Sequence, residues 1–329
     1  MIPPPSTPPP SNPPLAGSGP SPTGEGQNGP VAVVTGANRG IGRALAGALG
    51  ERGYHLVLLC RTETKGRNTA LELEREGAAR RIDWLAADLE DPDAVRGAAE
   101  DAARRFPRIH LLVNNAGLVS RRYRETATGV EATLAVNHLA QVRFTLPLLP
   151  SLRAGALEDG EDGEVRIINV SSGAHARRFN AGAFDGPQGF SPGKAYAQSK
   201  LLNLLFTFDL APRLEALGIR VNAVHPGLVN THLLRTFLPG GLLAKPLSAL
   251  VGMVSQTPEE GARTPLFAAT DPGLRGVSGR YFRKGREAEP APVARDPATR
   301  DAARRWTAGL TGIDWGEAPR MATGEGGVE

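Results

Sequence analysis

Short apolar runs alternate with longer helical stretches along most of this 329-residue chain, and this alternation restricts the folds open to it. Largely apolar runs are typical of strands whose sheet is covered on both faces. Because helices separate the strands, crossover connections are needed and the strands lie parallel. We therefore expect a single α/β domain built on a doubly wound parallel sheet of about seven strands. The expected strands are residues 31–35, 55–60, 82–87, 110–113, 165–170, 219–224 and 278–282, and the expected helices are residues 41–52, a stretch ending at 76, 91–106, 126–149 and 193–217.

Both ends of the chain are expected to lie outside this domain. Residues 1–30 hold 11 of the 28 prolines and one charged side chain, Glu25, so they cannot bury enough apolar surface to fold. Their Pro-Pro-Pro runs favour polyproline II, which suits an SH3-like partner; an inert extension is the simpler alternative. We expect a disordered Pro-rich tail over residues 1–30, a folded domain over residues 31–310, and a flexible tail over residues 311–329.

Composition excludes several classes of protein. No run of 18 apolar residues occurs and the start lacks the regions of a secretory signal, so neither a transmembrane segment nor secretion is expected. Cys60 is the only cysteine and the six histidines have no metal-ligand spacing, so no metal is expected. The 33 arginines are interleaved with acids and only 5% of residues are aromatic, which argues against nucleic acid as a partner. We expect a cytoplasmic protein that acts on a small molecule.

A glycine-rich turn joins the first expected strand to the first helix. It reads Thr35-Gly36-Ala37-Asn38-Arg39-Gly40-Ile41-Gly42. Glycines at these positions allow a sharp turn and let a pyrophosphate approach the backbone N–H groups of the helix N-terminus. Such a site lies at the carboxyl edge of the sheet, where Rossmann-type folds bind dinucleotides. A purely structural turn is the alternative.

The end of the second strand indicates which dinucleotide is bound. A carboxylate at this place would hold the ribose 2′-hydroxyl of NAD, but the sequence here is Cys60-Arg61-Thr62. Arg61, with Arg39 from the glycine-rich turn, could instead grip a 2′-phosphate in fork geometry. We therefore expect NADP(H) to be preferred over NAD(H). The alternative is that Arg61 only solvates the strand end.

Tyr196 and Lys200 form the candidate catalytic pair. Residues four apart share one helix face, so the ammonium of Lys200 would lie near the phenol of Tyr196 and lower its pKa toward neutral pH. Tyr196 would then serve as the acid/base. Ser172, at the end of the fifth strand, could hold a substrate oxygen. Asn137 lies within an expected helix, either holding a water or as a satisfied buried amide.

These pieces, in this order, resemble the short-chain dehydrogenase/reductase family, within the retinol dehydrogenase-like branch, over about residues 30–310. The matching segments are residues 35–42, 114–117, 137, 172, 196–200 and 226–231. The resemblance implies that Ser172 orients the substrate, Tyr196 exchanges the proton, and Lys200 holds the nicotinamide ribose. It also implies that Asn137 supports a water in the proton relay. The cofactor-binding residues expected from the motifs and the resemblance together are Thr35, Gly36, Asn38, Arg39, Gly40, Ile41, Gly42, Arg61, Asp88, Leu89, Asn115, Ala116, Gly117, Tyr196, Lys200, Pro226, Gly227 and Thr231.

Two segments, residues 173–195 and residues 232–254, should shape the substrate pocket. The second is rich in leucine, which suits a lipophilic alcohol or carbonyl; a core-covering helix pair or a subunit contact are the alternatives. Many members of the branch carry an N-terminal membrane anchor, whereas this chain starts with a polar tail, which leaves a retinoid substrate and peripheral membrane association open. We expect an NADP(H)-dependent oxidoreductase. The resemblance also implies a possible homo-oligomer. A non-catalytic NADPH-binding regulator is the alternative.

Overall fold

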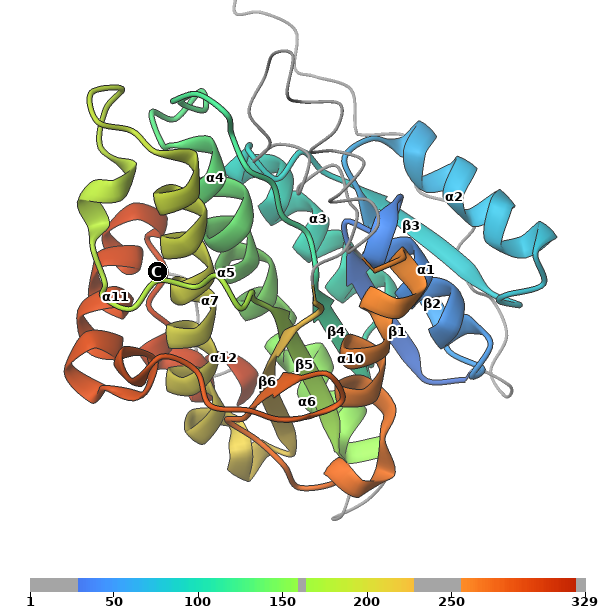
Figure 1. Cartoon of the computed structure of the whole chain (residues 1–329). Coiled ribbons are helices and arrows are strands. Elements are labelled where there is room, and N and C mark those ends of the chain that lie inside the picture. Colours follow the sequence, from blue (N-terminus) through green and yellow to red (C-terminus); the bar gives the residue numbers. More distant parts are fainter. Residues whose placement is uncertain (1–28, 159–163, 228–255, 324–329) are drawn as a thin grey trace, which may run out of the picture.

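A single sheet of eight strands forms the centre of the molecule in the computed structural model, which describes residues 29–158, 164–227 and 256–323 (Figure 1). The strands lie in the order β3-β2-β1-β4-β5-β6-β7-β8, and all neighbours pair in parallel except β7 and β8. This arrangement confirms the doubly wound α/β fold. The strands are β1 (Val31–Thr35), β2 (His55–Cys60), β3 (Ile82–Ala86), β4 (Leu111–Asn114), β5 (Val165–Val170), β6 (Ile219–His225), β7 (Tyr281–Arg283) and β8 (Arg286–Glu287).

The eighth strand was not expected from the sequence. It follows β7 through a tight turn in which Lys284 has a φ of 55° and Gly285 a φ of 67°. Two consecutive positive φ values twist a hairpin in the same sense as its strands. The two-residue β8 is too short to produce a recognisable apolar run, which is why the pattern predicts seven strands.

Helices cover both faces of the sheet. Their bounds are α1 (Gly40–Gly50), α2 (Glu63–Arg75), α3 (Pro92–Arg105), α4 (Ala132–Leu134), α5 (Ala140–Thr145), α6 (Leu149–Glu158), α7 (Pro192–Leu214), α10 (Pro258–Thr270), α11 (Pro297–Thr311) and α12 (Ala318–Thr323). Several start at side-chain caps: the side chain of Asp91 accepts from the backbone of Asp93 and Ala94, and that of Ser191 from the backbone of Lys194.

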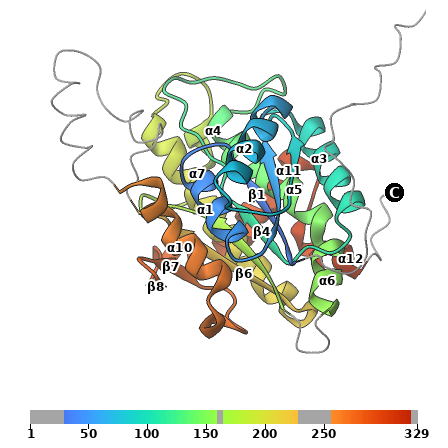
Figure 2. The ribbon, with the colours of Figure 1, turned by 90° about the vertical axis from the view of Figure 1, so that its right-hand side faces the viewer.

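The two faces have separate apolar cores. One core joins α1, α2 and α10 to alternate strand residues such as Val34 and Leu58. The other joins α3, α5, α6, α12 and part of α7 to the intervening residues, such as Val33 and Val57. In Figure 2, α10 lies to the left of the sheet and α6 and α12 to the right. Because both faces are covered, the carboxyl edge of the sheet is where a ligand can reach the strands.

The expected helix over residues 126–149 is interrupted and displaced. It begins at Ala132, where the side chain of Glu131 accepts from the backbone N–H of Leu134 at 2.9 Å. Residues 135–139 form a π-helical turn, residues 146–148 a 3₁₀ turn, and α6 continues to Glu158. Pro147 lacks the N–H that a regular helix would use, which accounts for the second interruption. Asn137 lies within the π-helical turn, a local structure that is frequent at functional sites.

The expectation of a flexible tail from residue 311 onward is wrong for residues 311–323. Trp315 is fully buried, and its Nε1 donates to Asp209 Oδ2 at 2.8 Å. Ala318 and Ala322 belong to the same core as α6 and α7. A single buried tryptophan anchors this short segment, and periodicity alone does not reveal that anchor. Residues 1–28, which hold nearly all of the expected Pro-rich tail, lie outside the described residues.

No helix within the described residues is both long enough and apolar enough to cross a lipid bilayer.

Candidate functional site

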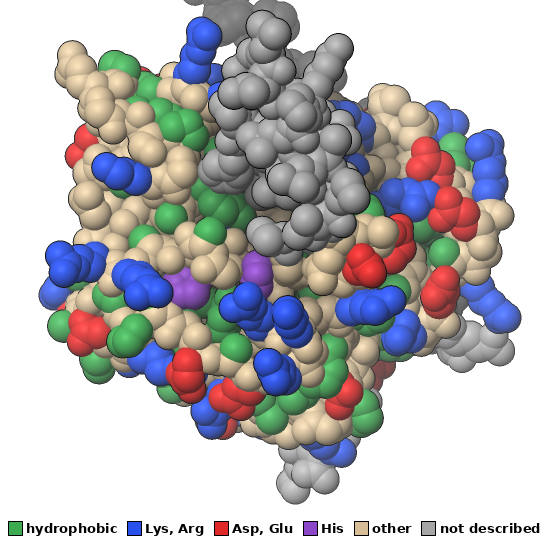
Figure 3. Space-filling model, viewed as in Figure 1, with side chains coloured by type: hydrophobic (Ala, Val, Ile, Leu, Met, Phe, Trp, Pro, Cys, Tyr) green, Lys and Arg blue, Asp and Glu red, His purple; other side chains and the backbone are tan. Residues whose placement is uncertain are grey.

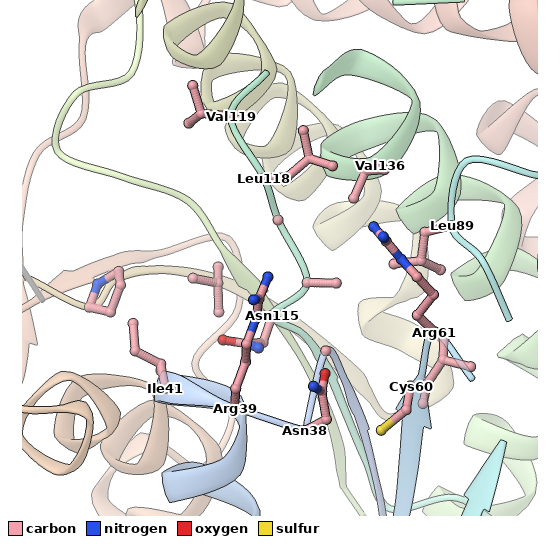
Figure 4. Close-up of a pocket in the computed structure, with 18 of the residues that line it drawn as sticks. Asn38, Arg39, Ile41, Cys60, Arg61, Leu89, Asn115, Leu118, Val119 and Val136 are labelled. Atoms are coloured by element: carbon pink, nitrogen blue, oxygen red, sulfur yellow. The ribbon is translucent and has the colours of Figure 1, made fainter. Parts of the chain in front are cut away.

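A cavity of about 560 Å³ opens at the carboxyl edge of the sheet (Figure 4). It lies where the strand order reverses, between β1 and β4, which is the place at which doubly wound sheets bind ligands. Among the residues predicted for the site, those that line the cavity are Gly36, Asn38, Arg39, Gly40, Ile41, Gly42, Arg61, Leu89, Asn115, Ala116, Gly117, Tyr196, Lys200 and Pro226. The structure therefore brings together the glycine-rich turn and the Tyr196–Lys200 pair, which are some 150 residues apart in the chain.

The glycine-rich turn is built for close approach. Gly36 has a φ of 67°, and a Cβ there would lie 2.9 Å from the Cα of Ala116. Helix α1 begins at Gly40 with no side-chain cap from Arg39 and no acidic residue in its first turn. The positive end of the helix dipole thus faces the cavity, and none of the described residues that line the cavity is a carboxylate that could neutralise it.

Thr35 does not line the cavity but braces it. Its Oγ1 accepts hydrogen bonds from the backbone N–H groups of Asn115 and Ala116, both at 3.0 Å. The side-chain amide of Asn115 returns a hydrogen bond to the carbonyl of Thr35 at 2.9 Å. These bonds fix the end of β4 against the end of β1, so the two walls of the cavity hold a constant spacing.

Besides Lys200, three basic side chains line the cavity: Arg39, Arg61 and Lys65. Figure 4 shows Arg39 and Arg61 both extended along the open space. Arg61 is about half exposed, and its guanidinium lies 3.8 Å from Asp88 and 3.9 Å from Glu90, which are long separations for ion pairs. Asp88 was expected to bind the cofactor, but it does not line the cavity. Its carboxylate faces Arg61, while the neighbouring Leu89 lines the cavity wall.

Cys60 also lines the cavity, beside Arg61. Burial raises the pKa of its thiol to about 11. The thiol is therefore neutral near pH 7 and acts as a small apolar group.

Tyr196 and Lys200 both lie on the buried face of α7. The Nζ of Lys200 is 5.8 Å from the centroid of the Tyr196 ring and donates to the carbonyl of Val170 at 2.9 Å. Burial lowers the pKa of Lys200 to about 8. Burial also raises the pKa of Tyr196 above its usual value, with a hydrogen bond to Ser172 acting in the opposite direction. The expected depression of the Tyr196 pKa by Lys200 is therefore absent here, since the desolvation of the phenol outweighs the favourable contacts.

Ser172 contacts Tyr196 from the loop that follows β5. Its Oγ accepts from the backbone N–H of Ala174 at 3.1 Å. The preceding Ser171 lines the cavity but donates its hydroxyl to the carbonyl of Lys200 at 2.8 Å. Ser171 thus anchors α7 to β5, whereas Ser172 has a hydroxyl proton to direct at Tyr196 or at a substrate oxygen.

Asn137 ties the cavity wall to α7. Its Oδ1 accepts from the N–H of Leu118 at 2.8 Å, and its Nδ2 donates to the carbonyl of Leu118 at 2.9 Å and to Ser199 Oγ at 3.0 Å. Ser199 in turn donates to the carbonyl of Tyr196 at 2.8 Å. Both N–H donors of the Asn137 amide bond to protein atoms. This agrees with one of the two alternatives from the sequence, a buried amide whose hydrogen bonds are satisfied. A Cβ at Gly117 would lie 3.4 Å from both Asn137 Oδ1 and Lys200 Nζ. These two polar groups therefore both lie next to Gly117 in the cavity wall.

Within the described part of the chain, five predicted residues are not among those that line the cavity: Thr35, Asp88, Asn137, Ser172 and Gly227. Gly227 follows the lining residue Pro226 with a φ of 98°. Thr231 and residues 232–254 lie outside the described residues. Sequence reasoning missed several lining residues: Leu59, Lys65, Ala87, Leu118, Val119, Val136, Val170 and Pro258. Lys65 had a recognisable signal, because it follows Arg61 by four residues and lies in the first turn of the helix that comes after β2.

The residues present fit a nicotinamide dinucleotide. The uncapped start of α1 can bind a pyrophosphate, and the basic side chains near the end of β2 can bind a further anionic group. Tyr196 and Lys200 provide polar groups at the other end of the cavity.

Comparison with known proteins agrees with this site. A family model described as short chain dehydrogenase matches residues 30–239. Retinol dehydrogenase 11 of Mus musculus is 38% identical over 255 residues, which are 77% of this chain and 77% of that protein. Polyprenol dehydrogenase of Mus musculus is 38% identical over 301 residues, which are 90% of this chain and 88% of that protein. The crystal structure of a variant actinorhodin polyketide ketoreductase with NADPH superposes with a TM-score of 0.60 at 26% identity, covering 78% of this chain and 95% of that chain.

The fold, the order of motifs and these relatives agree with one another. The chain therefore belongs to the short-chain dehydrogenase/reductase family, in its retinol dehydrogenase-like branch, and is an oxidoreductase that acts on CH–OH donors.

Proposed function

We propose that this enzyme interconverts a lipophilic alcohol and its carbonyl form with NADP(H), and that Tyr196 moves the proton. The observation that carries the proposal is that Tyr196 and Lys200 line the same cavity as the glycine-rich turn. When bound, a nicotinamide cofactor would supply or accept the hydride. The proton must then be supplied or accepted by the protein, and Tyr196 is the titratable hydroxyl at that end of the cavity.

The neighbours of Tyr196 divide the remaining work. Ala174 donates to Ser172 Oγ, so the serine proton is directed away from Ala174, toward Tyr196 or a substrate oxygen. Ser172 can thus hold a carbonyl or alcohol oxygen within reach of the phenol. Lys200 donates to the Val170 carbonyl with one of its three protons and can offer the others to cofactor hydroxyls. Asn137 holds Leu118 and Ser199, and through Ser199 it supports the backbone of Tyr196.

The preference for NADP(H) is supported by the charge at the end of β2. Arg39, Arg61 and Lys65 all line the cavity, and no carboxylate of the described residues does. Asp88 and Glu90 lie near Arg61, but at 3.8 Å and 3.9 Å they bind it loosely. A 2′-phosphate would form shorter, charge-assisted hydrogen bonds with the guanidinium.

A lipophilic substrate is supported by the apolar wall that Leu118, Val119, Val136 and Pro258 contribute. The relatives named for retinol and polyprenol, both long isoprenoid alcohols, point in the same direction. The cytoplasmic location, the homo-oligomer and a partner for the Pro-rich tail stay predictions.

The experiment is a screen of NADPH and NADH oxidation with all-trans-retinal, medium-chain aldehydes, steroids and quinones. We expect turnover of a lipophilic aldehyde with NADPH and a lower kcat/KM with NADH. Tight NADPH binding without turnover of any substrate would favour the regulator instead. A higher kcat/KM with NADH would refute the cofactor preference alone.

A further inference from the structure

His175 is held between two backbone groups directly beside the candidate catalytic serine. Its Nδ1 lies 2.6 Å from the carbonyl oxygen of Ser172, and its Nε2 lies 2.9 Å from the backbone nitrogen of Ala291. The two anchors are 119 residues apart in the sequence (291 minus 172). The ring also packs edge-on against the buried Tyr281, with centroids 5.8 Å apart. His175 therefore connects the serine loop to the segment that precedes α11.

These contacts fix the tautomer of the ring. A backbone N–H can only donate, so the bond from Ala291 requires Nε2 to be the acceptor. The ring proton of neutral His175 must then be on Nδ1, where it donates to the Ser172 carbonyl. Burial, with a smaller effect from the charge of Arg177, lowers the pKa of His175 below its ordinary value, although the Ser172 carbonyl opposes this. The ring is consequently neutral near pH 7, as both bonds demand.

The turn is anchored on both flanks, by the N–H of Ser171 to the carbonyl of Val224 at 2.8 Å and by the N–H of Ala176 to the carbonyl of Ala197 at 3.0 Å. Between these anchors, the His175 tether acts on Ser172 itself. Within the turn, the N–H of His175 donates to the Ser172 carbonyl at a long 3.3 Å, and the N–H of Ala174 donates to Ser172 Oγ at 3.1 Å. The 2.6 Å bond from Nδ1 is shorter than either of these. A shift of this carbonyl would move Oγ as well, since both belong to one residue, and errors of about 1 Å in such groups can slow a reaction a hundredfold.

We propose that His175 is a positioning residue, which holds Ser172 in register with Tyr196 by donating from Nδ1 to the serine carbonyl. The inference rests on the proposed function, because it assigns His175 a part in the same reaction. It adds a residue outside the Ser172, Tyr196, Lys200 and Asn137 set.

Three substitutions separate the two bonds. In His175→Asn, the amide Nδ2 can take the place of Nδ1 and donate to Ser172. In His175→Gln, the amide Oε1 can take the place of Nε2 and accept from Ala291. His175→Phe keeps the ring but removes both bonds. We expect the Phe and Gln variants to lose about tenfold to a hundredfold in kcat, and the Asn variant to lose less than about threefold.

The pH profile of alcohol oxidation distinguishes positioning from a general loss of structure. Because the Ser172 hydrogen bond lowers the pKa of Tyr196, displacing Ser172 should move the rising limb of the profile to higher pH. The shift should appear in His175→Phe and in Ser172→Ala but not in His175→Asn. Dissociation constants for NADPH should stay within about twofold of wild type throughout, since His175 does not line the cavity.

Several results would overturn the inference. One is a normal kcat in the His175→Phe variant. Another is a lowered kcat in this variant with no shift in its pH profile of alcohol oxidation. A Gln variant more active than the Asn variant would mean that the Ala291 bond is the important one. Should His175→Phe fail to fold, the Asn and Gln variants still give this comparison. Absence of turnover in the wild type would refute the proposed function itself, and the inference with it.

Discussion

The ammonium of Lys200 donates to the carbonyl of Val170, the last residue of β5, at 2.9 Å. This bond holds the cation against the end of a buried strand, 5.8 Å from the ring centroid of Tyr196. Both side chains are nearly inaccessible to solvent, so each is driven toward its neutral form: the pKa of Lys200 falls to about 8, and that of Tyr196 rises. The free enzyme thus keeps a buried charge that the fold does not favour.

Replacing Lys200 with Met should therefore stabilise the fold while it abolishes turnover. Lowering the pKa of a lysine from 10.5 to about 8 corresponds to about 3 kcal/mol of unfavourable free energy at neutral pH. Some of this is offset by the lost bond to Val170, which leaves a net gain on the order of 1–2 kcal/mol. Urea unfolding near pH 7 measures the gain.

The sign of the pH dependence follows from the direction of the Lys200 shift. Between pH 8 and 10.5, the unfolded lysine binds more protons than the folded one, so the wild type gains stability as the pH rises. The advantage of Lys200→Met should shrink over this range and vanish above it. The exposed Lys194, in the first turn of α7, provides the control: its Met variant should show no such trend. An advantage that stays constant with pH would mean that Lys200 is not the source.

Tyr196→Phe should lower kcat by about 10²–10⁴-fold, because it removes the hydroxyl that would carry the proton and leaves the ring in place. The affinity for NADPH, followed by fluorescence titration, should stay within about twofold of wild type. Tyr123→Phe is the matched control, since that hydroxyl bonds to Glu125 at the surface and does not line the cavity. A Phe variant that loses NADPH binding together with activity would assign Tyr196 a structural part.

The fold was predictable because its strands are buried on both faces. The predicted bounds of β1, β2 and β5 agree with the structure, as apolar runs such as 55–60 lie wholly in the core. The seventh strand was placed too early: Ser278 accepts from the N–H of Val221 and Gly279 has a φ of 67°, and extended pairing starts only at Tyr281. A turn that uses the polar side chain of one residue and the positive φ of another is hard to distinguish from a strand by composition.

The site was predictable where it depends on strand ends and helical spacing. Residues such as Arg61 and Asn115 follow buried strands directly, and Tyr196 and Lys200 are one turn apart. Pro258 was not predictable, because it reaches the cavity from the start of α10. The predicted downward shift of the Tyr196 pKa was wrong for a related reason. Sequence spacing indicates that Lys200 lies near the phenol and would favour its charged form, whereas the burial that opposes this depends on how the whole chain packs around Tyr196.

Arg61→Ala should reduce kcat/KM for NADPH by about tenfold and leave that for NADH nearly unchanged. The variant removes a cation that would bind the 2′-phosphate, and a hydrogen bond to a charged group contributes about 1.5–3 kcal/mol. Arg67→Ala is the control, because Arg67 is exposed on α2, the helix that follows Arg61, but does not line the cavity. Equal losses with both cofactors would show that Arg61 does not discriminate between them.

Trp315→Ala should destabilise the whole domain, although Trp315 lies in a segment that composition marks as a tail. Its ring is fully buried against Phe206, with centroids 5.0 Å apart, and against His138 in the π-helical turn. Loss of a buried tryptophan typically costs about 3–5 kcal/mol, measurable as a lower urea midpoint. Trp315→Phe should lose less, because it fills most of the space and gives up only the bond to Asp209. Leu157→Ala, at a leucine that is 63% exposed, should leave the midpoint unchanged. If Trp315→Ala unfolded at the wild-type midpoint, residues 311–323 would contribute nothing to the stability of the domain.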